Sequence, residues 1–543
     1  MSKRLFTPIA VRGHPLLAMR LALAAVLAAS TPLLAQQAVP GGAPQPAPSP
    51  VFAIKGFKVT GDNPLGDGET ARVLAPFLRA DATMDSLQKA TAALETALRD
   101  RGFGLHRVAL PPQEVGDTVT LNIVKFVISR VTFEPLTIYN EANIRRSIPE
   151  LQEGQTPNFK TLAVQTAIAN ETPNKQLQVG IKEADEPDKI DAHLTVKESR
   201  PWTLGASLSN GGSASSGRDR FTISGGHTNL FNRDHQFVGA YTTSLQRTSD
   251  VKQIGLSYKV PLYTVGGVVG VNYTRSDVVG NFGSFTSTGA GHTTGINYTH
   301  YLPPDAGRRT YLSVAFDDKL FRASVIDTQT IGVDRRSRPI TVGYSTRTET
   351  DTAFWGYNVD FAFNTTGGHG NDLASYRAED ANINTARWKA LRGGASYSSV
   401  FNANWLWGVR SQYQYSPDAL ISGEQFGLGG LGSVRGTAIE RPVSGDKGLS
   451  TSLEVTTPEL APGLRLLAFI DAGWLGNNNP VAPKPHSDRL ASAGLGLRYG
   501  NGPYAVSLDY GHILSGSRVP LSLNSSSPQK GDNRFYINVS ARF

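Results

Sequence analysis

The chain contains no cysteine among its 543 residues. Disulfide bonds, thiol catalysis and metal sites with cysteine ligands are therefore excluded. The ten histidines are dispersed and show no metal-site spacing, so we expect no metal site. No G-x-x-x-x-G-K-[ST] motif is present, and the sequence shows no means of using ATP. Without an assembled nucleophile, base or metal site, we expect neither catalysis nor a cofactor.

The sequence also lacks long hydrophobic segments. No run of about 18 apolar residues occurs, which excludes an ordinary transmembrane helix. Hydrophobic residues make up 39% and charged residues 18% of the chain, a composition too polar for a helical membrane protein. A transmembrane β-barrel leaves no such run, because only every second side chain of each strand meets lipid.

Basic residues are not clustered after the N-terminus. The formal net charge is +8, and residues 1–35 contain four basic residues and no acidic residue, so the remainder carries 8 − 4 = +4. The remaining basic residues are scattered, which indicates an ordinary mixed surface and no nucleic-acid partner.

The N-terminal 50 residues resemble a leader followed by a linker. Residues 1–35 have a basic start and a short apolar core at 21–29, which is typical of a signal peptide; a retained amphipathic anchor is the alternative. Residues 36–50 contain five prolines and are expected to form an extended linker.

Residues 51–200 repeat one order of elements: strand, helix, helix, strand, strand. The first unit is expected at 51–126 and the second at 127–200, where Leu177, Val179 and Ile181 alternate with polar residues or glycine. We expect two small α+β modules, each with a sheet covered on one face by two helices. One larger α+β domain is the alternative.

From residue 201 helical periodicity disappears and strands of period two follow one another to residue 543. Such a run is typical of a sandwich, a propeller or a barrel. Aromatic residues near strand ends, polar opposite faces and alternating short and long connections favour an antiparallel membrane barrel. The polar stretch Asp327 to Ala353 is expected to be one long connection. The segment has 543 − 200 = 343 residues, enough for about sixteen strands at roughly 21 residues each.

A glycine-rich segment from Gly427 to Gly473 is the most informative part of the barrel. Its first glycines satisfy G-x-G-x-x-G, but no helix follows, so we interpret them as a loop. We expect Val434, Arg435 and Gly436 near the loop tip, and a turn at residues 445–448 before the strand 449–455. The next strand, 464–471, would place Leu466, Ala468 and Ile470 on the lipid face and Leu467, Phe469 and Asp471 in the lumen.

A carboxylate at Asp471 in the lumen requires a partner, because an unpaired charge in a partly dehydrated site is costly. Arg435 is the candidate, since its planar guanidinium can bind a carboxylate through two parallel hydrogen bonds. The alternative is a solvated loop arginine and an unrelated lumen aspartate.

The sequence resembles the two-partner secretion transporters of the ShlB/FhaC/HecB family over nearly all of the mature chain. The marks of the resemblance are Val434-Arg435-Gly436, the Gly445-Asp446-Lys447-Gly448 turn, Glu454, the Phe469-x-Asp471-x-Gly473 strand and the terminal Phe543. The resemblance implies two POTRA modules in the periplasm, a barrel in the outer membrane and a loop folded into the lumen, where Arg435 locks to Asp471. It also implies that Phe543 belongs to the signal read by the barrel-assembly machinery.

Two features depart from the family pattern. An aromatic residue usually follows V-R-G, whereas this chain has Thr437, from which we expect a looser loop tip with the arginine still in place. The short Pro-rich linker leaves no room for the N-terminal plug helix of some members.

The resemblance favours export of an unfolded partner exoprotein of the TpsA type, without nucleotide. The exoprotein would add as a strand to a module edge, and Leu177, Val179 and Ile181 are the candidate edge residues. A barrel insertase of the BamA superfamily is one alternative, although its main bacterial member is implied to have five POTRA modules. A passive porin is the other, although a diffusion pore needs no periplasmic modules.

Overall fold

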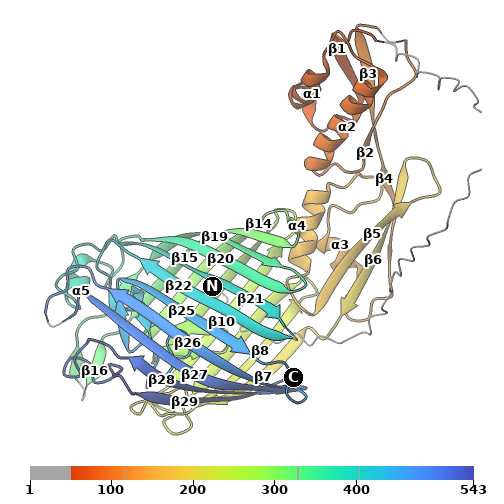
Figure 1. The fold of residues 1–543 in the computed structure, drawn as a ribbon. Helices are drawn as coiled ribbons and strands as arrows, with labels where there is room; N and C mark the ends of the chain where they lie inside the picture. The colour runs from red at the N-terminus through yellow and green to blue at the C-terminus, as the bar shows by residue number, and fades with distance from the viewer. Residues whose placement is uncertain (1–50, 115, 327–328, 403, 483) are drawn as a thin grey trace, which may run out of the picture. The chain divides into compact units, whose positions relative to one another are not determined.

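The computed structural model describes residues 51–114, 116–326, 329–402, 404–482 and 484–543. The expected signal peptide, linker and missing plug helix concern residues 1–50 and lie outside the described residues. The first module contains β1 (Gly56–Gly61), α1 (Gly66–Leu74), η1 (Ala75–Phe77), α2 (Met84–Asp100), β2 (His106–Ala109) and β3 (Thr118–Lys125). Its sheet has the order β1-β3-β2, with β1 parallel to β3 (Figure 1).

The second module repeats this topology. It contains β4 (Val127–Phe133), α3 (Glu141–Ser147), α4 (Phe159–Ala169), β5 (Lys175–Glu183) and β6 (Lys189–Glu198), and its sheet has the order β4-β6-β5. Asn140 and Asn158 begin the two helices, and each side chain accepts hydrogen bonds from N–H groups of the first turn. Among the described residues, no helix is both long and apolar enough to cross a membrane.

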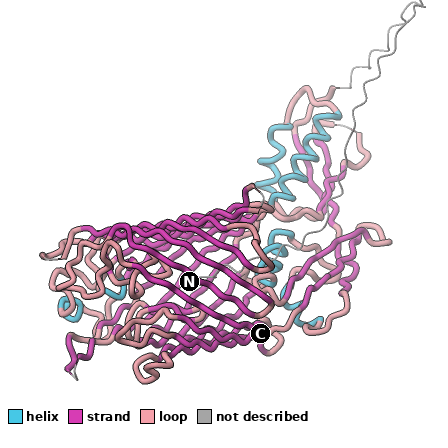
Figure 2. Tube along the Cα trace, turned by 60° about the horizontal axis from the view of Figure 1, so that its bottom comes forward, coloured by secondary structure: helices cyan, strands magenta, loops and turns pink. Residues whose placement is uncertain are grey.

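The strands after residue 201 close into one antiparallel ring (Figure 2). Within the described residues the ring has seventeen segments, of which β18 and β19 are separated only by Arg338 and both pair with β15. They continue one strand, so the ring has sixteen, which confirms the predicted fold class. The segments are β7 (Trp202–Ser209), β8 (Arg220–Leu230), β9 (His235–Thr243), β10 (Lys252–Leu262), β11 (Gly267–Ser276), β14 (Gly291–Tyr301), β15 (Arg308–Phe321), β18 (Arg335–Ser337), β19 (Pro339–Glu349), β20 (Ala353–Asn364), β21 (Lys389–Phe401), β22 (Trp405–Tyr415), β25 (Lys447–Thr456), β26 (Leu464–Gly476), β27 (Ser487–Asn501), β28 (Tyr504–Ser515) and β29 (Asn533–Arg542).

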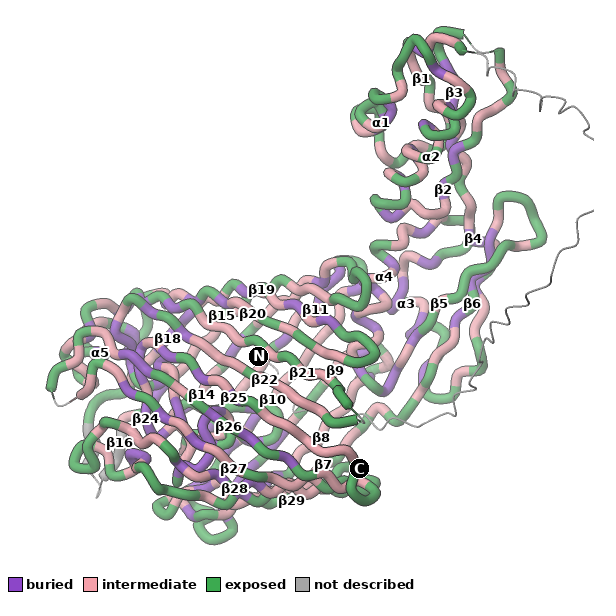
Figure 3. Tube along the Cα trace, viewed as in Figure 1, coloured by how far each residue is buried: buried purple, intermediate pink, exposed green. Residues whose placement is uncertain are grey.

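The ring closes between its last and first strands. Asn538 to Arg542 of β29 pair with Ser209 to Gly205 of β7, so no open edge remains. A closed ring satisfies every backbone amide without water, which is the condition for crossing lipid. Exposed and buried side chains alternate along the strands, and β26 shows Leu466, Ala468 and Ile470 outside as expected (Figure 3).

The expected long connection from Asp327 to Ala353 is wrong. Residues Pro339–Glu349 form the barrel strand β19, which pairs with β15 and β20. Ile340, Val342 and Tyr344 are the large apolar residues of this strand, and threonine, serine, arginine and glycine fill most other positions on both faces, so its apolar alternation is short. The real connection here includes the small hairpin β16 (Ser324–Ile326) and β17 (Gln329–Ile331).

Short and long connections lie at opposite ends of the barrel. At one end the turns are tight, such as residues 502–503 between β27 and β28, and at the other end three connections are long (Figure 2). The long connections are 365–388 with α5 (Leu373–Arg377), 416–446, and 516–532, and the hairpin β12 (Gly280–Phe282) and β13 (Phe285–Ser287) lies on a fourth.

The second module and the barrel form one compact unit. The core of the module, including Ile144, Ile168 and Leu177, continues into Tyr263 and Tyr301 at the short-turn end of the barrel. The module therefore packs on the turns of the wall.

Candidate functional site: the inner loop of the barrel

The connection 416–446, which we call the inner loop, contains the elements that form the site. It begins with η2 (Ser422–Glu424) and includes the hairpin β23 (Phe426–Leu428) and β24 (Val443–Gly445). Its tip lies against side chains on the buried face of β25, β26 and β28, opposite the exposed lipid face. The inner loop therefore lies inside the barrel.

The structure brings Arg435 and Asp471 together. Arg435 Nε donates to Asp471 Oδ2 at 2.7 Å and Nη2 donates to Oδ1 at 2.8 Å, the two parallel bonds of a bidentate pair. The backbone N–H of Arg435 also donates to Oδ2 at 3.1 Å, which fixes the chain as well as the side chain. Arg435 is 3% exposed and Asp471 is fully buried.

Other wall residues complete the surroundings of Arg435. Nη2 donates to Ser452 Oγ at 3.0 Å, and Nη1 lies 2.7 Å from Glu454 Oε1 and 3.6 Å from Asp509 Oδ1. The guanidinium carbon lies 3.4 Å from the centre of the Phe469 ring, close enough for a cation–π contact. A single buried cation is thus held by carboxylates from three strands, β25, β26 and β28.

Close backbone approach holds the tip next to this pair. Gly436 has φ +110°, a conformation that favours glycine, and its N–H donates to Tyr536 Oη at 3.1 Å. A Cβ on Gly511 would lie 2.7 Å from Gly436 N, so the wall also requires glycine there.

Thr437 does not show the looser tip that we expected from its replacement of an aromatic residue. The side chain is 1% exposed, accepts a hydrogen bond from Gly430 N–H at 2.8 Å and donates to the Ile439 carbonyl. Its own carbonyl accepts from Tyr536 Oη at 2.9 Å. The hydroxyl therefore fastens the tip to the rest of the inner loop.

Apolar contacts hold the hairpin of the inner loop against the wall. Val434 is fully buried in a cluster with Leu428 and Ile513. A Cβ on Gly473 would lie 2.6 Å from Leu428, and one on Gly448 would lie 2.2 Å from Phe426. These two wall glycines make room for the hairpin.

The expected turn at residues 445–448 is wrong, whereas Glu454 lies in a strand as expected. Gly445 ends β24, Gly448 lies in β25, and Glu454 faces the lumen from β25. Asp446 stands between the two strands as a buried junction: it accepts from Leu420 N–H, Gln425 Nε2 and Asn478 N–H at 2.7–3.1 Å. Glycine and aspartate are typical of turns, but here β24 and β25 follow each other with only Asp446 between them.

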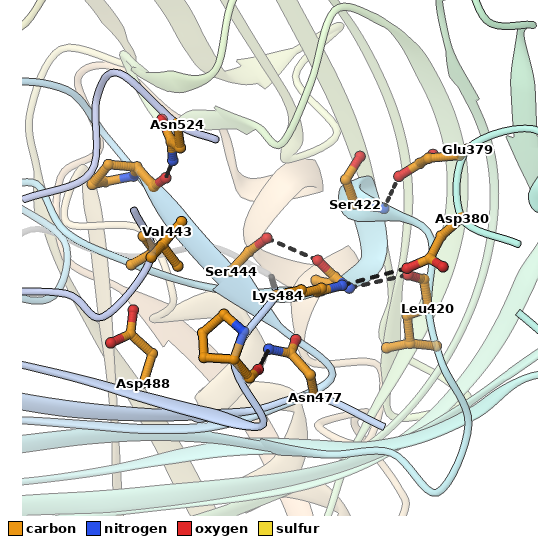
Figure 4. A pocket seen from close by; sticks show the side chains of 14 residues that line it. Glu379, Asp380, Leu420, Ser422, Val443, Ser444, Asn477, Lys484, Asp488 and Asn524 are labelled. Carbon is orange, nitrogen blue, oxygen red and sulfur yellow. Dashed lines mark hydrogen bonds and ion pairs between the residues drawn. The ribbon is translucent and has the colours of Figure 1, made fainter. Parts of the chain in front are cut away.

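Residues of the inner loop and of three other connections line a cavity of about 300 Å³ (Figure 4). Lys484 lies 3.4 Å from Asp380, and Ser422 N–H donates to Glu379 Oε1 at 2.7 Å. Asn524 Nδ2 donates to the Pro442 carbonyl at 2.6 Å. These bonds tie 477–486 to 365–388 directly and tie 365–388 and 516–532 to the inner loop.

The candidate edge residues lie on β5, which is one of the two edge strands of its sheet. Leu177 is buried and its backbone N–H and carbonyl are both bonded to the Asn170 side chain, so this position is already occupied. Because partners alternate along an antiparallel strand, Val179 and Ile181 also direct their backbone groups outward. Among the described residues β5 pairs only with β6, which leaves the edge at 179–183 as the candidate surface.

A buried ion pair joins the second module to the barrel. Lys175 Nζ lies 2.5 Å from Asp234 Oδ2, and Asp234 also accepts from Asn143 Nδ2 at 3.1 Å and Tyr263 Oη at 2.7 Å. Burial lowers the pKa of Lys175, and Asp234 partly offsets that effect. A second contact joins Glu171 to Arg347 at 2.7 Å.

Phe543 lies one residue beyond β29. Its backbone exchanges two hydrogen bonds with Leu204 of β7, and the residue is exposed, as are Phe535, Ile537 and Val539 on the same face of β29. The terminal residue thus takes part in ring closure.

Sequence reasoning missed three residues of the site: Ser452, Asp509 and Tyr536. A signal existed for Asp509, because Asp509-x-Gly511 repeats the spacing of Asp471-x-Gly473. Ser452 and Tyr536 carry no local signal, since they matter only once the inner loop lies in the lumen.

Comparisons with known proteins agree with this architecture. The family model for haemolysin secretion/activation protein ShlB/FhaC/HecB matches residues 188–499, and the model for the ShlB-type POTRA domain matches residues 52–125. The outer membrane transporter CdiB of Escherichia coli is 23% identical over 469 residues, which cover 83% of this chain and 77% of that protein. The outer membrane transporter CdiB of Dickeya dadantii (strain 3937) is 22% identical over 445 residues, covering 79% and 77%.

Two solved structures share the fold. CdiB from Escherichia coli matches with a TM-score of 0.72 and 19% identity over 93% of each chain. CdiB from Acinetobacter baumannii matches with a TM-score of 0.68 and 15% identity over 91% of this chain and 90% of that one. Because the secretion/activation model covers more than half of the chain, and the sixteen-stranded barrel follows POTRA modules, the protein belongs to the ShlB/FhaC/HecB family, the outer-membrane transporters of two-partner secretion whose POTRA modules lie in the periplasm.

Proposed function

We propose that the chain exports one dedicated partner exoprotein, which its periplasmic modules bind unfolded and its barrel passes outward without nucleotide hydrolysis. The modules are assigned to residues 51–126 and 127–200, and the barrel to 201–543. The observation that carries the proposal is the inner loop, which is bound inside the lumen through the buried Arg435–Asp471 pair. A loop fixed inside the lumen sets the space that an extended polypeptide can use, so its position bears directly on export.

Arg435 and Asp471 act as the lock of the inner loop in this proposal. The lock fixes the loop in the one position inside the lumen from which export proceeds, and Val434, Gly436, Phe469 and Gly473 shape its seat. Main-chain hydrogen bonds to the β5 edge give affinity for an extended polypeptide with little regard to its side chains. Phe543, in the closing strand, is proposed as part of the signal that the barrel-assembly machinery reads.

The test is secretion of a candidate exoprotein encoded beside this gene, in cells with and without this protein. Release into the medium only when the protein is present, with other outer-membrane barrels at normal levels, supports export. Release in both strains, together with a fall in barrel levels when the protein is missing, would instead identify a barrel insertase. Uptake of small solutes through the purified barrel without any exoprotein dependence would identify a porin.

A further inference from the structure

A second buried charge lies at the base of the inner loop, eleven residues before Arg435. Glu424 belongs to η2, and its side chain is 1% exposed. Its Oε1 lies 3.1 Å from Lys319 Nζ and accepts a hydrogen bond from Ser337 Oγ at 2.9 Å. Its Oε2 accepts from Arg392 Nη2 at 2.9 Å, and its backbone carbonyl accepts from the same nitrogen at 3.0 Å.

All of these partners belong to the barrel wall. Lys319 lies on β15, Ser337 on β18 and Arg392 on β21, and none of them is part of the Arg435 site. The two sites occupy different arcs of the ring, since Arg435 contacts β25, β26 and β28. They also differ in depth: Lys319 and Arg392 lie within three residues of the outer ends of their strands, whereas Asp471 lies five residues from Gly476.

The two sites have opposite charge. At the base of the inner loop an anion is buried among two wall cations, and at the tip a cation is buried among three wall carboxylates. Removing one partner of a buried pair leaves the other charged and desolvated, so each site resists release on its own. Neither end of the loop can occupy the site of the other, because like charges would meet.

We propose that the inner loop is a strap fixed at two points of opposite charge, and that Glu424 is a positioning residue that keeps its base on the β15–β21 wall. Release of Arg435 then swings only the tip and opens the side of the lumen next to β25–β28. Release of Glu424 frees the base and leaves the tip bound. This inference rests on the proposed function for its role in transport, but the two anchors can be tested without any exoprotein.

The absence of cysteine provides a direct assay, because each variant then carries a single thiol. Ile421 reports on the base and Val434 on the tip, since both side chains are fully buried. A membrane-impermeant maleimide is added to intact cells that carry I421C or V434C alone and in combination with E424Q or R435A. Folded barrel is quantified on unheated gels in every case.

We expect E424Q to raise the labelling rate of I421C at least about tenfold and R435A to raise that of V434C similarly, each with a much smaller effect at the other site. The matched control is E440Q, which removes a carboxylate of the same loop that accepts from Leu431 N–H; it should leave I421C protected. Should E424Q fold poorly, K319Q and R392Q replace it, because each removes one wall cation and leaves Glu424 unchanged; either should also raise the labelling rate of I421C.

Equal labelling of I421C in E424Q and E440Q, or unchanged labelling in both K319Q and R392Q, would overturn the second anchor whatever happens to secretion. If labelling separates as expected while no exoprotein depends on the protein for export, the strap stands and the proposed function fails.

Discussion

At the scale of single residues, the Arg435–Asp471 pair gives the most direct prediction. Arg435→Ala leaves Asp471 buried without its cation, a loss of roughly 3–5 kcal/mol of loop anchoring that should lower partner secretion about tenfold or more. Asp471→Ala should resemble it, because either change abolishes the same bidentate contact. The double variant should be little worse than either single variant.

The measurement is exoprotein in the medium relative to the amount of folded transporter in the outer membrane. Barrel levels should stay near normal, since the pair joins the inner loop to the wall and lies outside the strand pairing. Fully additive defects would show that the two residues act separately and would contradict the lock.

A glycine of the wall gives a second residue-scale prediction. Gly511→Ala places a Cβ 2.7 Å from Gly436 N and 2.8 Å from the Arg435 carbonyl carbon, so the tip must move away from its seat. We expect faster labelling of V434C and a smaller secretion defect than in Arg435→Ala. Gly500→Ala is the matched control, because a Cβ there has no neighbour within 4 Å. Equal behaviour of the two variants would show that the close approach at Gly511 does not hold the tip.

At the scale of elements, the sequence predicts whatever is repeated locally. Alternating side chains identify β7, β26 and β29, and the repeated order of strand, helix, helix, strand and strand indicates α3 and α4. The strand β19 is not predicted from the sequence, because its three large apolar residues lie among threonine, serine and arginine. These polar residues are as common in a loop as on the wet lumen face of a barrel. Residues 445–448 suggest a turn because glycine and aspartate are typical of turns. In the structure Gly448 makes room for Phe426, and Asp446 is a buried acceptor between two strands.

The edge strand β5 gives a prediction at this scale. Val179→Pro removes an outward N–H without breaking a bond to β6, so it should weaken binding of the unfolded exoprotein to the full-length protein several-fold. Val179→Ala is the control, because it shortens the half-buried side chain and keeps the N–H. Pull-down of unfolded exoprotein with the full-length protein in detergent compares the variants. Unchanged binding by the proline variant would count against this edge.

At the scale of the whole molecule, contacts between distant segments decide the function, and no local pattern contains them. Arg435 and Asp471 can be paired as a hypothesis from the sequence, because a carboxylate in the lumen requires a cation and an arginine lies only 36 residues before it. Lys175 and Asp234, 59 residues apart, could not, since each is an ordinary polar residue until the second module packs on the barrel turns. The same holds for Glu424, whose partners lie 105 residues before it and 32 residues before it.

The ion pair between Lys175 and Asp234 gives the last prediction. The Lys175 side chain is 1% exposed, so Asp234→Asn strands a buried ammonium and should loosen the second module from the barrel by about 3–5 kcal/mol. Lys175→Met with Asp234→Asn should restore much of this loss, because the buried charge is gone. Limited proteolysis of the module in intact outer membranes measures the docking, and Glu141→Gln, in an exposed ion pair on α3, is the control. Because the contact between Glu171 and Arg347 remains, we expect the module of Asp234→Asn to stay attached but to be cleaved faster. Equal cleavage rates of Asp234→Asn and Glu141→Gln would mean that the Lys175–Asp234 pair does not hold the module in place.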